Sequence, residues 1–257
     1  MNFPNITLVA ALALVTVPAF AQTAAPPPPP PPPWTLTGNA GLFSDYTFRG
    51  ISQTNTKPAF QGGFDVGHES GFYAGNWNSN VDAAMYNGAN LEMDFYGGFK
   101  ATFGDFGLDV GGIYYYYPGS GAASSVKIDN GEIYVGGSWG PLTAKYFYAV
   151  TDFFGAPNSD GSAYLDLGFS YDLGSGFGLV AHVGYQRLKG GAIAAEISGS
   201  APDSITDYKL GGTYTVNGFV LGAAFVGTNR DYSFGTASSS GKNVSDNTFV
   251  VSVSKSF

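Results

Sequence analysis

The sequence predicts an all-β protein: a transmembrane, antiparallel up-and-down β-barrel of about twelve strands, with short periplasmic turns and longer external loops. Three observations support this fold class. Many segments alternate apolar and polar residues, short turns alternate with long connections, and the chain ends on an alternating strand whose last residue is Phe257. Alternating segments of about ten residues, joined by turns of unequal length, are typical of outer-membrane barrels.

The alternation is clearest at residues 91–100. Leu91, Met93 and Phe95 occupy every second position there, and charged residues occupy positions between them. Segments 73–82, 165–172 and 177–186 alternate in the same way, and no segment has a convincing helical period. A period of two residues places alternate side chains on opposite faces of a strand. These segments are therefore predicted strands with one apolar and one polar face.

The connections between the strands are of two kinds. Tight turns rich in Gly, Asp, Asn or Pro are expected at 69–72, 103–106, 139–142, 174–177 and 216–219. Longer loops are expected at 50–58, 82–89, 118–129, 153–162, 188–204 and 231–245. Five turns that alternate with six loops join twelve strands, and an even number brings both chain ends to the short-turn side.

A soluble β-sandwich or lipocalin-like barrel is the alternative, because parity alone does not show which face points outward. Aromatic residues beside the short turns favour the membrane barrel, since they resemble an interfacial girdle: Tyr73, Phe106, Trp139, Phe177 and Phe219. We expect the last strand to close the barrel against the first, near 34–49, and lipid to cover its apolar face. That face forms the expected signal for the barrel-assembly machinery: Phe249, Val251, Val253 and Phe257.

The N-terminal region indicates export. Residues 1–21 contain an apolar core followed by Ala19-Phe20-Ala21, a pattern typical of a cleaved signal peptide. A membrane anchor is the alternative, although the core is short for a span. Residues 22–33 form an Ala/Pro-rich periplasmic linker, in which eight prolines favour a polyproline II spacer or, alternatively, a docking rod. The barrel is predicted at 34–257, in the bacterial outer membrane.

The composition argues against several functions. The formal net charge of −8 argues against nucleic acid as a partner, because phosphate binding needs a basic face. Cysteine is absent and the two histidines do not form a metal-binding motif, so neither a metal nor another cofactor is expected. An outer-membrane phospholipase is a possible enzyme, but no serine motif accompanies His182, and we predict that the protein is not an enzyme.

Several stretches resemble a known family. SDYTFRGISQT at 44–54 followed by GFYAGNWNSNVD at 71–82 is the most specific pair, and IYYYYPGSG at 113–121 and SVSKSF at 252–257 agree with it. They resemble the TorF family of porin-like proteins over nearly all of the chain after Trp34. The resemblance implies an outer-membrane barrel with pore activity, and it carries no catalytic residues.

The polar parity supplies the residues expected to line the lumen: Asp45, Arg49, Gln61, Asp65, Asn76, Asn78, Asn80, Asp82, Glu92, Asp94, Lys100, Asp109, Glu132, Lys145, Asp166, His182, Gln186 and Lys209. Acidic residues outnumber Lys and Arg in this set, and rings of carboxylates favour cations. We therefore predict passive diffusion of small hydrophilic solutes or ions through a narrow lumen that mildly prefers cations. A lumen plugged by paired charges is the alternative, because twelve strands lie between filled and open barrels.

Asp45 and Arg49 are expected near the top of the first strand, where they would pair with residues such as Asp65 or Asp94. Such pairs would form either a salt-bridge network at the rim or a solute-selecting constriction. The rival function is a non-conducting structural or adhesive barrel that acts through its external loops or polyproline linker. The expected partners are outer-membrane lipid, the assembly machinery during biogenesis, and small solutes.

Overall fold

The structure, a computed structural model, describes residues 32–122, 126–193, 198–232 and 242–257. The predicted signal peptide at 1–21 and the predicted linker as far as residue 31 lie outside the described residues. The remaining chain forms the barrel. Within the described residues, no helix is long and apolar enough to cross a membrane.

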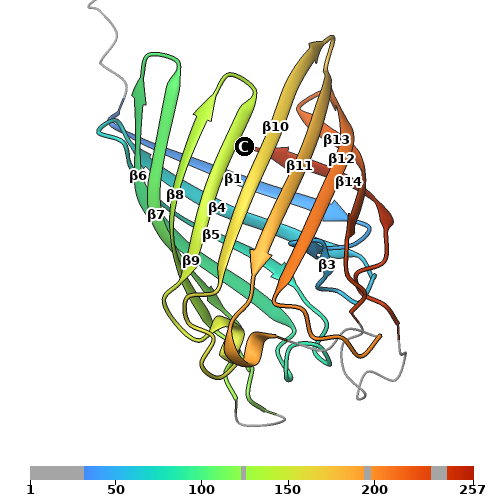
Figure 1. Ribbon diagram of the computed structural model, residues 1–257. Coiled ribbons are helices and arrows are strands. Elements are labelled where there is room, and N and C mark those ends of the chain that lie inside the picture. Colours follow the sequence, from blue (N-terminus) through green and yellow to red (C-terminus); the bar gives the residue numbers. More distant parts are fainter. Residues whose placement is uncertain (1–31, 123–125, 194–197, 233–241) are drawn as a thin grey trace, which may run out of the picture. The chain divides into compact units, whose positions relative to one another are not determined.

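Within the described residues, twelve long strands close into one antiparallel barrel, in agreement with the prediction (Figure 1). The strands are β1 (Trp34–Phe43), β4 (Ala59–His68), β5 (Phe72–Asn80), β6 (Leu91–Phe103), β7 (Phe106–Tyr116), β8 (Asn130–Trp139), β9 (Leu142–Ala149), β10 (Ala163–Gly174), β11 (Phe177–Arg187), β12 (Ser204–Val216), β13 (Phe219–Thr228) and β14 (Thr248–Ser256). Each strand pairs with its neighbours in the chain, and β14 pairs with β1.

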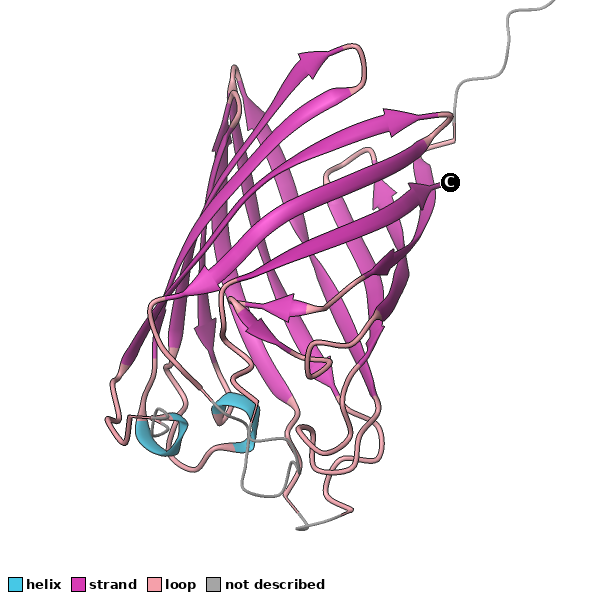
Figure 2. Cartoon of the chain, turned by 90° about the vertical axis from the view of Figure 1, so that its right-hand side faces the viewer, coloured by secondary structure: helices cyan, strands magenta, loops and turns pink. Residues whose placement is uncertain are grey.

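Short turns lie at one end of the barrel and long loops at the other (Figure 2). The turn between β12 and β13 shows why the sequence chooses these residues, since Asn217 has a φ of 50° and Gly218 a φ of 78°. Two consecutive residues with positive φ form the type I′ turn that matches strand twist, and Asn-Gly is its preferred pair. Short 3-10 helices, η1 (Phe153–Gly155) and η2 (Gly190–Ala192), lie in the long loops.

The first strand is shorter than predicted. It ends at Phe43 instead of continuing towards Arg49, and the chain then forms a small separate sheet from β2 (Thr47–Phe48) and β3 (Ile51–Ser52). Asp45 and Arg49 therefore belong to the first long connection and not to the barrel wall. This second, smaller hairpin was not predicted, because its residues were divided between the first strand and the loop at 50–58.

Barrel closure extends to the last residue of the chain. The backbone N–H of Phe257 donates to the Gly38 carbonyl at 2.9 Å, and the Gly38 N–H donates to the Phe257 carbonyl at 2.7 Å. A Cβ atom at Gly38 would lie 2.7 Å from the Phe257 ring, so glycine leaves room for the ring. The terminal residue is thus part of the seam between β1 and β14.

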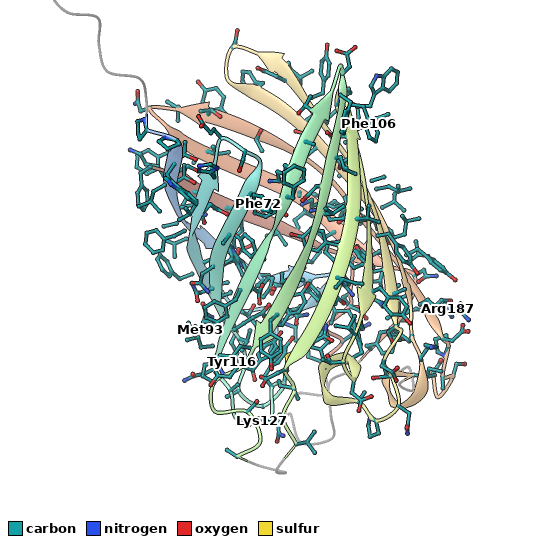
Figure 3. The ribbon with its side chains drawn as sticks, turned by 90° about the vertical axis from the view of Figure 1, so that its left-hand side faces the viewer. Phe72, Met93, Phe106, Tyr116, Lys127 and Arg187 are labelled. Carbon is teal, nitrogen blue, oxygen red and sulfur yellow. The ribbon has the colours of Figure 1, made fainter. Side chains whose placement is uncertain are left out.

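The outer face of the barrel is apolar. Large hydrophobic side chains project from most strands, and they include Leu36, Phe60, Phe72, Leu210 and Phe249. Aromatic residues gather beside the short turns, and Figure 3 shows Phe106 at that end and Lys127 at the opposite end. An apolar exterior around a polar interior is the reverse of a soluble barrel and fits a lipid environment.

Strand β5 has the opposite orientation to the one predicted. Asn76 lies directly opposite Phe64 and Phe95, which point outward, and residues directly opposite in a pair share a face. Asn76, Asn78 and Asn80 therefore face outward, and their prediction as lumen residues was wrong. The Asn78 amide donates to the Gly62 carbonyl at 3.2 Å and to Asn76 Oδ1 at 2.6 Å.

The same reversal turns Tyr73 and Trp77 into the lumen. Tyr73 donates a hydrogen bond to Asp109, and Trp77 packs on Tyr46 of the first long connection. Tyr73 therefore does not belong to the outer girdle, and Phe72 takes that place. The lumen contains a folded segment that needs aromatic packing partners, so apolar character does not identify the outer face of this strand.

A charge on the outer face tests the orientation of the wall. Leu210 on β12 is 59% exposed and points outward, whereas Thr213 on the same strand lines a lumen cavity. We expect Leu210→Arg to lower the free energy of unfolding by about 2–4 kcal/mol in lipid, the usual cost of such a charge in the hydrocarbon region. Urea unfolding of the protein in vesicles measures this. Thr213→Arg is the control and should cost less than about 1 kcal/mol; equal losses would contradict the orientation.

Candidate functional site

A hairpin crosses the lumen. The connection after β1 folds inward as β2 and β3, joined by a tight turn at Arg49 and Gly50 with φ of 48° and 79°. Arg49 donates to Glu132 Oε2 on β8 at 2.7 Å and to Gln186 Oε1 on β11 at 2.6 Å. Strands β8 and β11 are several positions away from β1 in either direction around the barrel. The tip of the hairpin therefore contacts the far wall.

Arg49 is held by charge and by aromatic rings. Its side chain is 8% exposed and that of Glu132 is 1% exposed. Its guanidinium carbon lies 4.2 Å from the centroid of the Tyr164 ring and 4.7 Å from that of Phe48. Burial alone would lower the pKa of Arg49, but the charge of Glu132 outweighs this effect and raises the pKa, so Arg49 stays charged.

Glycine is required at the tip of the hairpin. A Cβ atom at Gly50 would lie 2.4 Å from Thr228 on β13 and 2.7 Å from Asp207 on β12. Its positive φ also disfavours other residues. The hairpin thus fits closely against β12 and β13 as well as against the strands that Arg49 reaches.

The base of the hairpin is tied together by Asp45. Its Oδ1 accepts hydrogen bonds from Ser52 at 2.7 Å and Thr54 at 2.8 Å. Burial raises the pKa of Asp45, although these hydrogen bonds oppose the shift. These contacts are local, and the predicted pairing of Asp45 or Arg49 with Asp65 or Asp94 does not occur; Asp65 instead accepts a hydrogen bond from Tyr96 at 2.6 Å.

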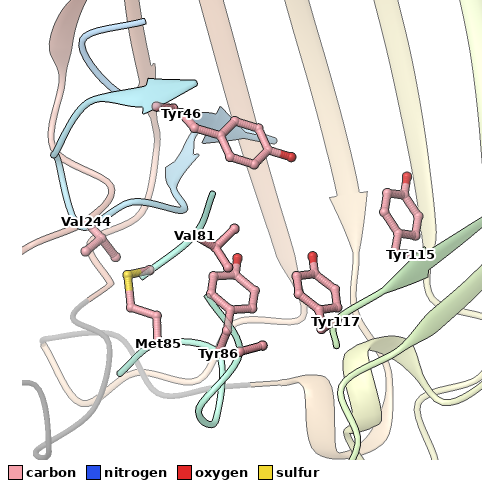
Figure 4. Packing of buried hydrophobic residues seen from close by; sticks show 9 residues of the cluster. Tyr46, Val81, Met85, Tyr86, Tyr115, Tyr117 and Val244 are labelled. Carbon is pink, nitrogen blue, oxygen red and sulfur yellow. The ribbon is translucent and has the colours of Figure 1, made fainter. Parts of the chain in front are cut away.

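Aromatic residues fill the space between the hairpin and the neighbouring long loops (Figure 4). Tyr86, from the loop after β5, stacks on Tyr117, from the loop after β7, with ring centroids 4.9 Å apart. Tyr46 belongs to the hairpin segment and donates to Glu92 on β6 at 3.0 Å. This cluster fixes one flank of the hairpin to β6 and to two loops.

The loops are also tied to each other by charge. Lys57, at the end of the first long connection, lies 2.8 Å from Asp82 in the next long loop. Burial would raise the pKa of Asp82, but the hydrogen bonds from Lys57 and the Ala84 N–H lower it overall. The pair lies at the long-loop end of the barrel, so Asp82 is not a residue of the lumen wall.

Other predicted lumen residues form networks along the wall. Lys145 binds Asp109 at 2.7 Å, and Asp109 also accepts from Tyr73 at 2.6 Å. His182 lies between Asp166, at 3.3 Å from Nδ1, and Asp207, at 2.8 Å from Nε2. The structure places these residues on the inner face together with the remaining members of the predicted set: Gln61, Asp65, Glu92, Asp94, Lys100, Glu132, Gln186 and Lys209.

Three residues of these networks were not predicted from the sequence. Asp207 holds His182, Tyr164 packs against Arg49, and Tyr134 accepts or donates a hydrogen bond with Tyr73 at 2.5 Å. Asp207 shares the parity of Lys209, which was predicted, so alternation could have found it. Tyr134 and Tyr164 share the parity of Glu132 and Asp166, so alternation could have found them too, but only charged and amide residues of that parity were predicted to line the lumen.

The hairpin separates cavities of different character. A polar cavity of about 240 Å³ is lined by Arg49, Asp166, His182, Asp207 and Lys209, among others. A second one, of about 360 Å³, lies against Asp45 and the inner faces of β12, β13 and β14. A third, of about 370 Å³, lies between the hairpin and the long loops and is mainly apolar. Arg49 lines both the first and the third cavity.

The site has no arrangement that suggests metal chemistry. Within the described ranges, no group of three or more His, Cys, Asp or Glu side chains is placed to hold a metal ion. The acids of the wall contact basic or hydroxyl side chains, or lie buried beside tyrosines, as Glu92 does. The arrangement is that of a polar passage with a folded segment inside it.

Taken together, a closed twelve-strand antiparallel barrel with an apolar exterior, a charged interior and an inserted hairpin has the fold of porin barrels. The chain belongs to the family described as "Bacterial protein of unknown function (Gcw_chp)", whose model matches residues 28–257.

Two solved structures with TM-scores above 0.5 show the same fold, and a third is less similar. The NanC porin is 13% identical, with a TM-score of 0.55, and the match covers 86% of this chain and 99% of that one. A membrane protein from a study of in-meso crystallization is 8% identical, with a TM-score of 0.53 over 86% and 83% of the two chains. OpdL of Pseudomonas aeruginosa is 14% identical, with a TM-score of 0.43 over 86% and 67%. No curated protein matches the chain.

The ion pair at the tip of the hairpin can be tested by hydrogen exchange. Arg49→Met leaves Glu132 buried without its cation, and breaking a buried pair in this way typically costs about 3–5 kcal/mol. We expect exchange of the β2 and β3 amides to accelerate at least about a hundredfold, while the barrel strands keep their protection. Mass spectrometry of peptides from residues 44–58 measures the exchange rate of these amides.

Lys57→Met is the matched control, because it removes an exposed ion pair of the same connection. Exposed pairs contribute little, so exchange should change less than about threefold. Adding Glu132→Gln to Arg49→Met should restore part of the protection. Unchanged exchange in Arg49→Met would show that other contacts hold the hairpin.

Proposed function

We propose that the protein is an outer-membrane channel for passive diffusion of small hydrophilic solutes or ions, narrow and mildly cation-preferring. The observation that carries the proposal is the hairpin across a charged lumen. A folded segment inside the barrel narrows the passage, and polar cavities beside it leave room for water and small solutes. Transmembrane barrels have polar interiors, which are water-filled in porins and plugged in others, and the cavities beside this hairpin favour the water-filled form.

The cation preference rests on acids that have no cationic partner. Arg49, Lys145 and His182 each pair with acids of the wall. Among the described residues, ion pairs within 4.0 Å do not include four acids of the interior, Asp45, Asp65, Glu92 and Asp94, or two inner-face lysines, Lys100 and Lys209, so acids still outnumber bases. Any of these carboxyl groups that is ionised adds negative potential to the passage, which favours cations.

The same proposal includes export of the protein, its insertion into the outer membrane and its membership of the narrower TorF family. The apolar outer face supports a location in the bacterial outer membrane, reached through a cleaved signal peptide at 1–21. Phe257 and the apolar residues of β14 would serve as the signal for the barrel-assembly machinery. The narrower resemblance to the TorF family agrees with pore activity, and we propose no enzymatic function.

A non-conducting structural or adhesive barrel is the second candidate. The close fit of Gly50 against β12 and β13 favours it, because a hairpin that never moves would plug the lumen. The two candidates differ in one property, the passage of ions. In the second, the long loops or the proline-rich linker would be the working surface.

Planar-bilayer recording of the refolded mature protein separates the two candidates. We expect discrete conductance steps and, in a salt gradient, a reversal potential on the cation-selective side. Arg49→Ala should raise the conductance, because it releases the tip of the hairpin from Glu132 and Gln186. A folded, heat-modifiable barrel that never conducts, even with Arg49→Ala, would reject the channel.

The acids can be tested within the same recording. We expect Asp65→Asn combined with Asp94→Asn to reduce the cation-to-anion permeability ratio by about half or more, since both side chains face the lumen. The conductance should change less than the selectivity. Asp105→Asn, at the exposed short turn between β6 and β7, is the control and should leave the ratio unchanged. An unchanged ratio in the double variant would contradict the assigned source of selectivity.

A further inference from the structure

The apolar cavity at the long-loop end has the construction of a binding pocket. Its volume is about 370 Å³, within the usual range of roughly 300–1,000 Å³ for small-molecule sites. The hairpin forms its floor, and side chains from the loops after β5, β7, β9, β11 and β13 form its walls and roof. Segments distant in sequence therefore converge on one cavity.

The lining is far more apolar than a passage for hydrated ions requires. Aromatic and aliphatic side chains dominate it: Phe48, Ile51, Met85, Tyr86, Ile128, Phe153, Phe154, Leu188, Ile205 and Tyr232. Several of them, such as Leu188 and Ile205, are otherwise buried from solvent. These residues also belong to the packed clusters between the hairpin and the loops, yet their packing leaves this cavity, whose apolar walls suit an apolar occupant.

The polar groups of the pocket lie on the hairpin and the adjacent wall. They are the side chains of Arg49, Gln53 and Gln186. The charge of Arg49 is already balanced by Glu132 at 2.7 Å, and Gln186 accepts from Arg49. The pocket therefore has no unbalanced charge to attract an ion, but it has amide and guanidinium groups that can hydrogen-bond to a neutral group.

We propose that this pocket binds a small, uncharged aromatic or aliphatic molecule with a hydrogen-bonding group at one end. The apolar body lies among Phe153, Phe154, Leu188 and Ile205, and the polar end faces Arg49 and Gln53. Such a ligand contacts the hairpin from the long-loop side, directly over the residue that closes the polar cavity below. The proposal goes beyond the proposed channel function and does not require conduction.

Methionine methyl NMR with benzyl alcohol tests the pocket, because the sequence supplies its own control. The chain has methionines only at positions 1, 85 and 93. Met85 lines the pocket, whereas Met93 lies on the outer face opposite Asn78. Both methyl groups can be followed in one sample of ¹³C-methyl-labelled protein in micelles.

We expect the Met85 methyl shift to saturate with a dissociation constant of about 1 mM, which is typical of a ligand of this size. The Met93 methyl shift should change linearly, as expected for partition of benzyl alcohol into the detergent. A linear response at both methionines would overturn the proposal. Conductance is not part of the readout, so a failure here is distinct from a failure of the channel.

Variants that fill the cavity provide the second arm. Ile205→Trp places a larger ring in the pocket, and we expect it to weaken benzyl alcohol binding at least about tenfold. Leu210→Trp, on the outer face of the same strand, is the matched control and should change affinity less than about twofold. Saturable binding that persists unchanged in Ile205→Trp would place the ligand elsewhere and overturn the proposal.

Folding of each variant is checked by heat modifiability on a gel. Ala156→Phe, which fills the same pocket from the loop after β9, replaces Ile205→Trp if that variant does not fold. Because the cavity exists before the substitution, a filled pocket should leave the melting temperature unchanged or raise it. The Met85 titration of the unmodified protein decides the question without either variant.

Discussion

The ion pair between Arg49 and Glu132 holds the tip of the hairpin against the far wall of the lumen. Both side chains are almost fully buried, and removing either one leaves the other charge without compensation in a poorly solvated space. The pair therefore favours one position of the hairpin tip, with Gly50 against β12 and β13. The position of the hairpin tip also determines the shapes of the cavities on either side, since Arg49 forms part of the wall of two of them.

A filled lumen changes the meaning of the strand pattern. In an open channel, water lines the inner face and polar residues identify it. Here Trp77 turns inward to pack on Tyr46 of the hairpin segment, Tyr73 turns inward to hydrogen-bond to Asp109 of the wall, and Asn76 and Asn78 turn outward. The amides remain tolerable on the outer face because they hydrogen-bond to backbone carbonyls and to each other.

The sequence predicted the barrel itself, because strand number and closure follow from local signals. Turn residues such as Asn217 and Gly218 fix each hairpin independently, and alternation fixes the register of β6, β10 and β11. The hairpin at 47–52 was missed because the prediction divided it between the first strand and the loop at 50–58, and no local signal separates a strand of the wall from one inside the lumen. The partner of Arg49 could not be predicted either. Glu132 lies 83 positions away in the chain, and whether the two side chains meet depends on the diameter of the closed barrel.

The wall of the lumen is organised largely without the hairpin. Lys145 pairs with Asp109, and His182 lies between Asp166 and Asp207, so these charges keep their partners wherever the hairpin lies. Glu132 and Gln186 are the wall residues that Arg49 binds, and Tyr115 still donates to Glu132 at 3.3 Å. Movement of the hairpin would thus disturb few interactions of the barrel. Besides Arg49 and its aromatic contacts, such movement would break the hydrogen bond from Tyr46 to Glu92, so the hairpin is held at its tip and at one flank while the wall keeps its own charge pairs.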